Sequence, residues 1–198
     1  MVAKFSSNPG VLHWKAVARI FAYLKRTLRT PLVLSAHGGL HVEAYSDSDF
    51  AGDPDTAKST TGFLVRAGSA AVAFGTRTQT SWAQNVTEAE YLAALRTSNE
   101  VVWWRNITSE VWPKVSDAAT EIWVDNEGAI MQSQHPTNFD ASKHYTIASN
   151  VLRQRNTDKI VVLKSIRTDF NIADIFTKVL STMRFKQLAS ALLGSSVM

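Results

Sequence analysis

The sequence contains no cysteine, which excludes disulfide bonds and thiolate metal sites. It also has no apolar run of about 18 residues, the length that a membrane-spanning helix requires. Residues 1–7 lack the apolar core of a signal peptide. No internal repeat or low-complexity stretch interrupts the chain. We therefore expect an intracellular protein with no membrane span.

The composition is typical of one globular domain with extra segments, since 45% of the 198 residues are hydrophobic and 19% are charged. The net charge of +4 fits a polyanionic partner about as well as it fits none. The distribution of charge is more informative, because basic residues crowd positions 15–29 and four aspartates lie within positions 47–55. A basic flank and an acidic focus could hold phosphates at one place and a metal ion at another.

Hydrophobic periodicity predicts the order of the secondary-structure elements. Apolar residues recur at helical spacing over 13–28, after the start signals Asn8 and Pro9, and Gly38-Gly39 marks a domain boundary. The pattern then predicts strands at 40–46, 61–67 and 70–74, a helix from Thr87, a strand at 121–124, and helices from 127 and over 145–155. A strand at 159–166 and a helical stretch over 172–193, with a candidate break near Leu180, complete the chain. This β-β-β-α-β-α-α-β-α order indicates an α/β fold with a mixed five-stranded sheet flanked by helices.

Four acidic residues stand out by their positions. Asp47 ends the first strand, and Asp125 ends the fourth. Glu90 lies in the first turn of the long helix, and Asp174 lies early in the last helix. Carboxylates that follow neighbouring strands meet at one edge of a sheet, where they repel one another unless a cation neutralises them. Oxygen ligands of this kind suit Mg²⁺ or Mn²⁺, and two such ions roughly 4 Å apart can promote phosphodiester hydrolysis.

Each of these residues, taken singly, also has an ordinary structural interpretation. Asp47 fits a turn, and Asp125 fits a helix N-cap. Glu90 has the spacing of a capping box with Thr87, and Asp174 fits a solvated helix position. The metal-site prediction therefore depends on all four residues together, in this order and on these elements.

Six stretches of the sequence carry a more specific pattern. They read Tyr-Ser-Asp-Ser-Asp-Phe-Ala-Gly-Asp at 45–53, Lys-Ser-Thr-Thr-Gly at 58–62, Thr-Glu-Ala-Glu-Tyr at 87–91, Asp-Asn at 125–126, Lys-His at 143–144 and Ala-Asp-Ile-Phe-Thr-Lys at 173–178. In this order they resemble the ribonuclease H (RNase H) region of copia-type LTR retrotransposons, over about residues 40–180. The resemblance implies the RNase H-like fold, preceded by an N-terminal connection helix.

The resemblance also implies a metal-dependent endonuclease that hydrolyses the RNA strand of RNA–DNA hybrids during reverse transcription. Its cofactor would be Mg²⁺, with Mn²⁺ as an alternative. The catalytic and metal-binding residues would be Asp47, Glu90, Asp125 and Asp174, with Glu90 favoured over Glu88 by the Ala-Glu-Tyr match. Asp47 would contact both ions, Glu90 and Asp125 would complete one site, and Asp174 the other. The substrate-binding residues would be Lys58, Ser59, Thr60, Asn126, Lys143 and His144, although residues 58–60 fit a plain turn equally well.

The N-terminal residues resemble the end of a reverse transcriptase, through 5–9, 13–15 and 23–25. We therefore expect a connection segment at 1–36, an RNase H-like domain at 37–180, and a C-terminal helix and tail at 181–198. The expected partners are an RNA–DNA hybrid and the reverse transcriptase portion of the same polyprotein, in the cytoplasm or in virus-like particles. The chain would be part of such a polyprotein or a gene derived from one, and its oligomeric state is not predicted.

Two alternatives remain open at this point. An integrase or transposase of the same fold would place a glutamate last, whereas Asp174 is the last acidic residue of this set. A catalytically silent or domesticated module for binding or scaffolding would be marked by loss of the carboxylates, and all four are present. The silent-module alternative is supported by residues 145–150. They read Tyr-Thr-Ile-Ala-Ser-Asn, where the family usually has Ile-Asp and then Arg-Tyr-His.

Overall fold

The computed structural model describes residues 2–34, 41–111, 118–135 and 143–194, and it divides the chain into two compact units, 1–32 and 33–198. The domain boundary predicted at Gly38-Gly39, and hence the 36/37 division, lies outside the described residues. No helix among the described residues is both long enough and apolar enough to cross a membrane.

The first unit contains a short 3-10 helix, η1 (Val2–Phe5), and the helix α1 (Val11–Thr27). The periodicity predicted this helix, although it begins two residues earlier than expected because Gly10 is its N-cap. The Nδ1 atom of His13 accepts a hydrogen bond from the Gly10 amide (2.8 Å), and the His13 ring stacks on Phe5. Within this unit, no residue of α1 is buried.

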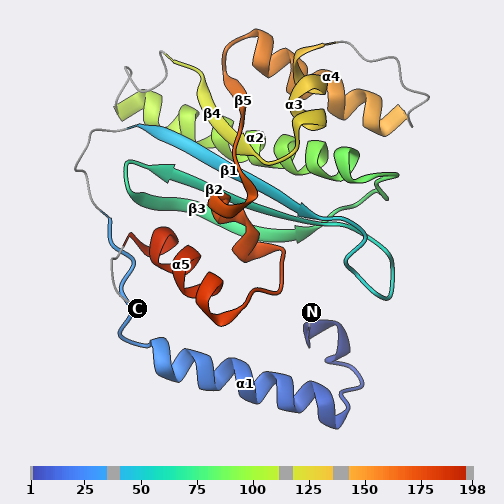
Figure 1. The fold of residues 1–198 in the computed structure, drawn as a ribbon, viewed down its shortest axis with the longest axis vertical. Helices are drawn as coiled ribbons and strands as arrows, with labels where there is room; N and C mark the ends of the chain where they lie inside the picture. The colour runs from blue at the N-terminus through green and yellow to red at the C-terminus, as the bar shows by residue number, and fades with distance from the viewer. Residues whose placement is uncertain (1, 35–40, 112–117, 136–142, 195–198) are drawn as a thin grey trace. The chain divides into compact units, whose positions relative to one another are not determined.

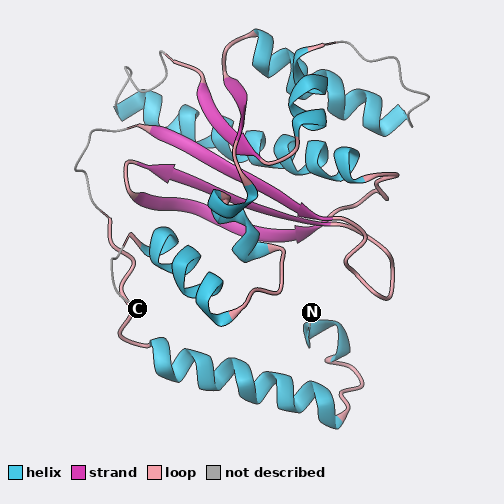
Figure 2. Ribbon diagram, in the orientation of Figure 1, coloured by secondary structure: helices cyan, strands magenta, loops and turns pink. Residues whose placement is uncertain are grey.

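The second unit is built on a mixed sheet with the strand order β3-β2-β1-β4-β5 (Figures 1 and 2). The strands are β1 (Val42–Asp49), β2 (Thr60–Ala67), β3 (Ala70–Thr78), β4 (Thr120–Val124) and β5 (Val161–Ser165). The first three strands are antiparallel, and β4 and β5 run parallel to β1. Connection length explains this difference: the β2–β3 hairpin turns through Gly68 at φ 62°, whereas helices intervene before β4 and β5.

Helices cover both faces of this sheet (Figure 1). One face carries α2 (Val86–Val111), with α3 (Glu127–Gln134) and α4 (Lys143–Thr157) beside it. Its core includes Tyr91 and Val101 of α2 against Ala44, Val65 and Ile122 of the sheet. The other face carries the 3-10 helix η4 (Ile172–Phe176) and α5 (Thr182–Leu193), over a smaller core. A further 3-10 turn, η3 (Thr168–Phe170), precedes η4.

The structure confirms the predicted order of elements and corrects two details. It also confirms the break near Leu180 within 172–193, because η4 ends at Phe176 and α5 begins after a new N-cap at Ser181. The predicted capping box of Thr87 with Glu90 is wrong, because the Asn85 side chain accepts the amide of Glu88 instead. Strand β1 continues to Asp49 because its pairing with β2 persists to that residue, so Asp47 lies within the strand.

Candidate metal centre

Two of the four predicted carboxylates come from neighbouring parallel strands. The pairing of Tyr45 with Trp123 sets the register of β1 and β4, and two residues further along each strand place Asp47 beside Asp125. Asp47 is fully buried, and Asp125 follows the last residue of β4 and is half-buried. The Oδ2 atom of Asp125 accepts a hydrogen bond from the Thr168 hydroxyl (3.0 Å). The parallel pairing thus brings both side chains to one edge of the sheet.

The third carboxylate comes from α2. Glu90 is 4% exposed, and its Oε1 atom accepts a hydrogen bond from the backbone amide of Ser48 (3.3 Å). One carboxylate oxygen each of Asp47, Glu90 and Asp125 lie within 4.8 Å of one another. Glu88, two residues earlier on the helix, instead accepts the amide of Gln84. The structure therefore brings together three of the four predicted carboxylates, with Glu90 as the member from α2.

Burial makes this cluster hold protons. It raises the pKa of the Asp47 carboxyl to about 6, although hydrogen bonds from Thr177 and Lys178 act in the opposite direction. Burial and, secondly, the nearby charge of Asp47 raise the pKa of Glu90 to about 8. At neutral pH the metal-free cluster therefore keeps Glu90 protonated, and binding of a cation would displace this proton to solvent.

The donor set fits a divalent metal ion that prefers oxygen. All three members offer carboxylate oxygens, the ligands that Mg²⁺ and Mn²⁺ take in proteins. The buried Oε2 atom of Glu90 has no hydrogen-bond partner among the described residues. A buried polar atom of this kind is costly to leave unsatisfied, and coordination of the ionised carboxylate to a cation would satisfy it.

Asp174, the fourth predicted carboxylate, lies in η4 and is held by cations. The Lys178 ammonium donates to Asp174 Oδ1 (2.6 Å) and to Asp47 Oδ1 (3.0 Å), and Arg184 lies 3.5 Å from Asp174 Oδ2. Burial alone would lower the pKa of Lys178, but its hydrogen bond to Asp174 and the charge of Asp47 outweigh burial and raise it. Lys178 thus links the fourth carboxylate to the cluster of three.

Sequence reasoning missed the roles of Lys178, Thr177 and Arg184. Thr177 donates a hydrogen bond to Asp47 Oδ2, and Arg184 also donates to the backbone oxygens of Thr168 and Asp169. The available signal was the four-residue spacing of Asp174 and Lys178 within the quoted Ala-Asp-Ile-Phe-Thr-Lys motif.

A glycine allows η4 to approach the sheet this closely. Gly62 of β2 pairs with Asp47, and a Cβ atom there would lie 2.7 Å from Thr177 Cγ2 and 2.8 Å from Phe176 Cβ. Only a residue without a side chain leaves room for η4 at this position. Gly62 therefore helps to place Thr177 and Lys178 against Asp47.

The predicted substrate-binding residues occupy different settings. Lys58 donates to the Thr80 carbonyl and lies over the Trp82 ring, whereas Ser59 is buried and accepts the Ala51 amide. Thr60 is half-buried and begins β2. Asn126 is the N-cap of α3, where its side chain accepts the amide of Ala129. Lys143 and His144 begin α4, but their side chains lie outside the described residues.

The strand order β3-β2-β1-β4-β5, with three antiparallel strands followed by two parallel ones, defines an RNase H-like α/β fold. The carboxylate cluster lies where the neighbouring parallel strands β1 and β4 end.

Over nearly its whole length the chain is similar to parts of much longer proteins. The retrovirus-related Pol polyprotein from transposon TNT 1-94 of Nicotiana tabacum is 31% identical over 194 residues, which are 98% of this chain and 14% of that protein. The Pol polyprotein from transposon RE1 of Arabidopsis thaliana is 30% identical over 189 residues, 96% of this chain and 13% of that protein. Homologues of this chain are thus retrovirus-related Pol proteins of plant transposons, and the chain spans about one seventh of their length.

Other similarities are more limited. The secreted RxLR effector protein 161 of Plasmopara viticola is 33% identical over 103 residues, which cover 52% of this chain and 72% of that protein. The crystal structure of LC11-RNase H1 in complex with an RNA/DNA hybrid aligns with 68% of this chain and 92% of its own, at 15% identity and a TM-score of 0.49. No family model matches the chain.

Proposed function

We propose that this chain is a metal-dependent endonuclease that hydrolyses the RNA strand of RNA–DNA hybrids during retrotransposon reverse transcription. The observation that carries the proposal is the meeting of Asp47, Glu90 and Asp125 oxygens within 4.8 Å, with Asp47 and Glu90 buried. Their order along the chain, with Glu90 second and Asp174 last, is the order that the RNase H resemblance implies and differs from the integrase order. Similarity to the Pol proteins supplies the retrotransposon context.

In this proposal, Asp47, Glu90 and Asp125 hold one Mg²⁺ or Mn²⁺ ion. Asp47 and Asp174 would hold a second ion, in place of the Lys178 ammonium that contacts both. A pair of such ions, when bound, supplies an activated water and stabilises the leaving oxygen of the phosphodiester. Neighbouring residues position the carboxylate ligands. The Ser48 amide donates a hydrogen bond to Glu90, and the Thr168 hydroxyl donates one to Asp125.

The substrate has an open approach beside Asp125. A cleft of about 470 Å³ is lined by Asp125 and Glu127 together with residues 165–169, which include Ser165, Arg167 and Thr168. Short hydroxyl side chains and an exposed arginine are common contacts to a nucleic-acid backbone. We propose that this cleft receives the RNA backbone, with residues 58–60, Asn126, Lys143 and His144 as further contacts. Recognition would then depend on duplex shape and 2′-hydroxyl groups.

The first unit fits a partner from the same polyprotein. Trp14, Phe21 and Leu28 of the N-terminal segment are 71%, 66% and 79% exposed, and exposed apolar surface of this kind is typical of interaction sites. We propose that residues 1–36 connect to the reverse transcriptase portion, that 37–180 form the nuclease domain, and that 181–198 complete it. The site of action would be the cytoplasm or virus-like particles.

Cleavage of an end-labelled RNA–DNA hybrid tests the proposal. The protein should cut the RNA strand with Mg²⁺ or Mn²⁺, stop in chelator, and leave the DNA strand intact. Asp125→Asn should abolish the cleavage, and Lys186→Gln, at an exposed position on α5, should not. Equal cutting of double-stranded DNA would contradict the RNase H assignment. Binding of the hybrid with no cleavage in any metal would favour the silent module instead.

A further inference from the structure

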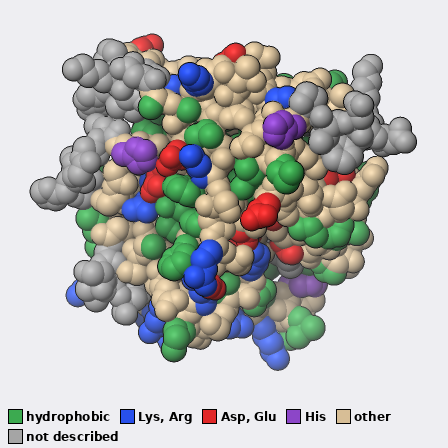
Figure 3. All heavy atoms as spheres, turned by 45° about the horizontal axis from the view of Figure 1, so that its top comes forward, with side chains coloured by type: hydrophobic (Ala, Val, Ile, Leu, Met, Phe, Trp, Pro, Cys, Tyr) green, Lys and Arg blue, Asp and Glu red, His purple; other side chains and the backbone are tan. Residues whose placement is uncertain are grey.

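Basic side chains do not form one continuous patch on the face seen in Figure 3, where they alternate with acidic and hydrophobic ones. A local grouping of charge lies outside the carboxylate cluster, between the edge strand β3 and α2.

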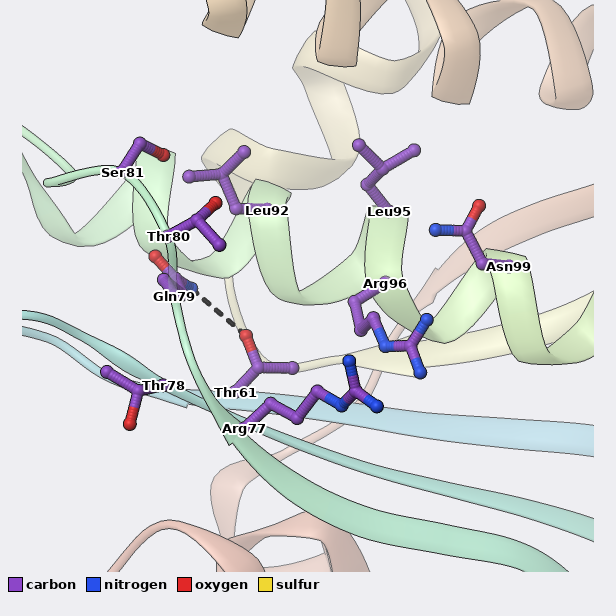
Figure 4. Close-up of a pocket in the computed structure, with 10 residues that line it drawn as sticks. All are labelled: Thr61, Arg77, Thr78, Gln79, Thr80, Ser81, Leu92, Leu95, Arg96 and Asn99. Carbon is purple, nitrogen blue, oxygen red and sulfur yellow. Dashed lines mark hydrogen bonds between the residues drawn. The ribbon is translucent and has the colours of Figure 1, made fainter. Parts of the chain in front are cut away.

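A pocket of about 260 Å³ opens there (Figure 4). Its lining contains two arginines, Arg77 and Arg96, and the amide side chains of Gln79 and Asn99. Threonine and serine hydroxyl groups complete the polar part, and no acidic residue lines the pocket. This combination of guanidinium, hydroxyl and amide donors is the chemistry that binds a phosphate group.

The two arginines approach the pocket from opposite walls, Arg77 from β3 and Arg96 from α2 (Figure 4). Arg96 is fixed in place, since it pairs with Glu100 and lies over the Phe63 ring. Arg77 is exposed and forms no ion pair with any residue that the structure describes. The Asn99 carbonyl accepts a hydrogen bond from Arg155, which leaves its amino group as a donor. The pocket thus has one anchored cation and one cation free to close on an anion.

Gln79 joins this pocket to the candidate metal centre. Its side-chain amide donates to Ala89 O (2.9 Å) and to Thr61 Oγ1 (3.1 Å), and Ala89 directly precedes Glu90. The pairing of Ser48 with Thr61, and of Thr61 with Arg77, places Arg77 two strands away from β1. Neighbouring strands lie about 4.8 Å apart, so Arg77 is roughly 10 Å from Ser48, about the rise of three base pairs. Strands β1 and β3 also run in the same direction, so their last residues lie at the same end of the sheet.

From this geometry we infer that the Arg77–Arg96 pocket binds a phosphodiester group of the nucleic acid whose scissile strand lies at the carboxylate cluster. The inference rests on the proposed function for the identity of the duplex. The pocket supplies affinity and register through the backbone, and it takes no part in the bond-breaking step.

Salt-dependent binding tests this inference. Affinity for a short fluorescent RNA–DNA hybrid is measured in chelator at several salt concentrations, for wild type, Arg77→Gln and the control Lys186→Gln. Removal of one phosphate interaction should reduce the slope of log K against log salt by about 0.9. Arg77→Gln should weaken binding several-fold at low salt and flatten the slope by about that amount, and Lys186→Gln should do neither. Equal slopes for Arg77→Gln and wild type would overturn the inference.

A second measurement locates the phosphate that the pocket binds. Hybrids that carry one neutral methylphosphonate linkage, moved along each strand in turn, remove one phosphate charge at a time. One position should weaken binding to wild type but not to Arg77→Gln, and the absence of any such position would overturn the inference. The proposed function fails separately: a wild type that never cleaves the hybrid, yet shows the Arg77-dependent slope, refutes the nuclease and leaves the pocket in place.

Discussion

The Lys178 ammonium lies 3.0 Å from the Oδ1 atom of Asp47, a carboxylate with no solvent exposure. The same ammonium lies 2.6 Å from Asp174, so one lysine neutralises part of the charge of two aspartates. The carboxylates closest to Lys178 are therefore stabilised by a cation that belongs to the chain, whereas Glu90 and Asp125 have none at this distance among the described residues.

Lys178→Met should destabilise the metal-free protein. The substitution keeps the aliphatic stem and removes the cation, which leaves Asp47 and Asp174 to repel each other. Because Lys178 is 36% exposed, the loss should lie between those of surface and buried pairs, about 1–3 kcal/mol. Urea unfolding at pH 7 in chelator measures it, with Lys186→Met as the control. A loss no larger than that of the control would contradict a structural role for the ammonium.

The metal-free protein should become less stable as the pH rises from about 4 to about 8. The folded pKa values of Asp47 and Glu90, about 6 and about 8, exceed the ordinary 3.8 and 4.5. The folded state therefore binds more protons than the unfolded state in this window, so the contribution of these groups is present at low pH and is lost through the folded pKa values. Each carboxyl should contribute a slope of up to about 1.4 kcal/mol per pH unit. A flat profile in chelator, measured by urea unfolding, would refute the raised pKa values.

Asp125→Asn should raise the melting temperature of the metal-free protein at pH 7. It removes the negative charge beside the buried Asp47 carboxylate and keeps an oxygen for the Thr168 hydrogen bond. Relief of repulsion on the order of 1 kcal/mol corresponds to roughly 2–4 °C in a chain of this size. Mg²⁺ should then stabilise wild type more than the variant. Melting curves in chelator and in Mg²⁺ check both points; a lower melting temperature for the variant, with equal Mg²⁺ shifts, would remove Asp125 from the metal site.

Glu90→Gln and Glu88→Gln form a matched pair on one helix. Because Glu90 is protonated at pH 7, the neutral amide should change metal-free stability by less than about 1 kcal/mol, yet it should abolish cleavage. Glu88→Gln should keep cleavage, because Glu88 is bonded to the Gln84 amide away from the cluster. At pH 9, Glu90→Gln should be more stable than wild type. Loss of cleavage in Glu88→Gln but not in Glu90→Gln would mean that Glu88, and not Glu90, is the metal ligand from α2.

Gly62→Ala should lower stability and loosen η4. The added methyl group would meet Thr177 and Phe176 below 3.0 Å, and overpacking of this kind costs about 1–3 kcal/mol. Gly75→Ala on the adjacent strand is a milder control, because its Cβ would lie 3.2 Å from the movable Phe63 ring. Urea unfolding of both variants provides the comparison. Equal losses would mean that Gly62 does not set the approach of η4.

The sequence was sufficient to predict the element order and the strand-end carboxylates, because hydrophobic period and position along a strand determine them. It was insufficient for Lys178, because its partner Asp47 lies 131 residues away and is brought close by the packing of η4. It was also insufficient for Arg184, which reaches Asp174 from a separate helix. Glu90 also shows the limit of local patterns. Its spacing from Thr87 is that of a capping box, yet its buried carboxyl accepts a hydrogen bond from the Ser48 amide. The Arg77–Arg96 pocket depends on the β2–β3 register, which periodicity does not specify.

The parallel pairing of β1 with β4 has a consequence for folding kinetics. Asp47 and Asp125 are 78 positions apart, and the three β1–β4 register pairs are between residues equally distant in sequence. Such long-range pairs form slowly, since a long loop must close before any of them can form. The hairpin β2–β3, by contrast, is local. A chain that has formed its antiparallel strands but not β4 therefore lacks Asp125 at the cluster, and the appearance of full metal affinity during refolding would time the docking of β4.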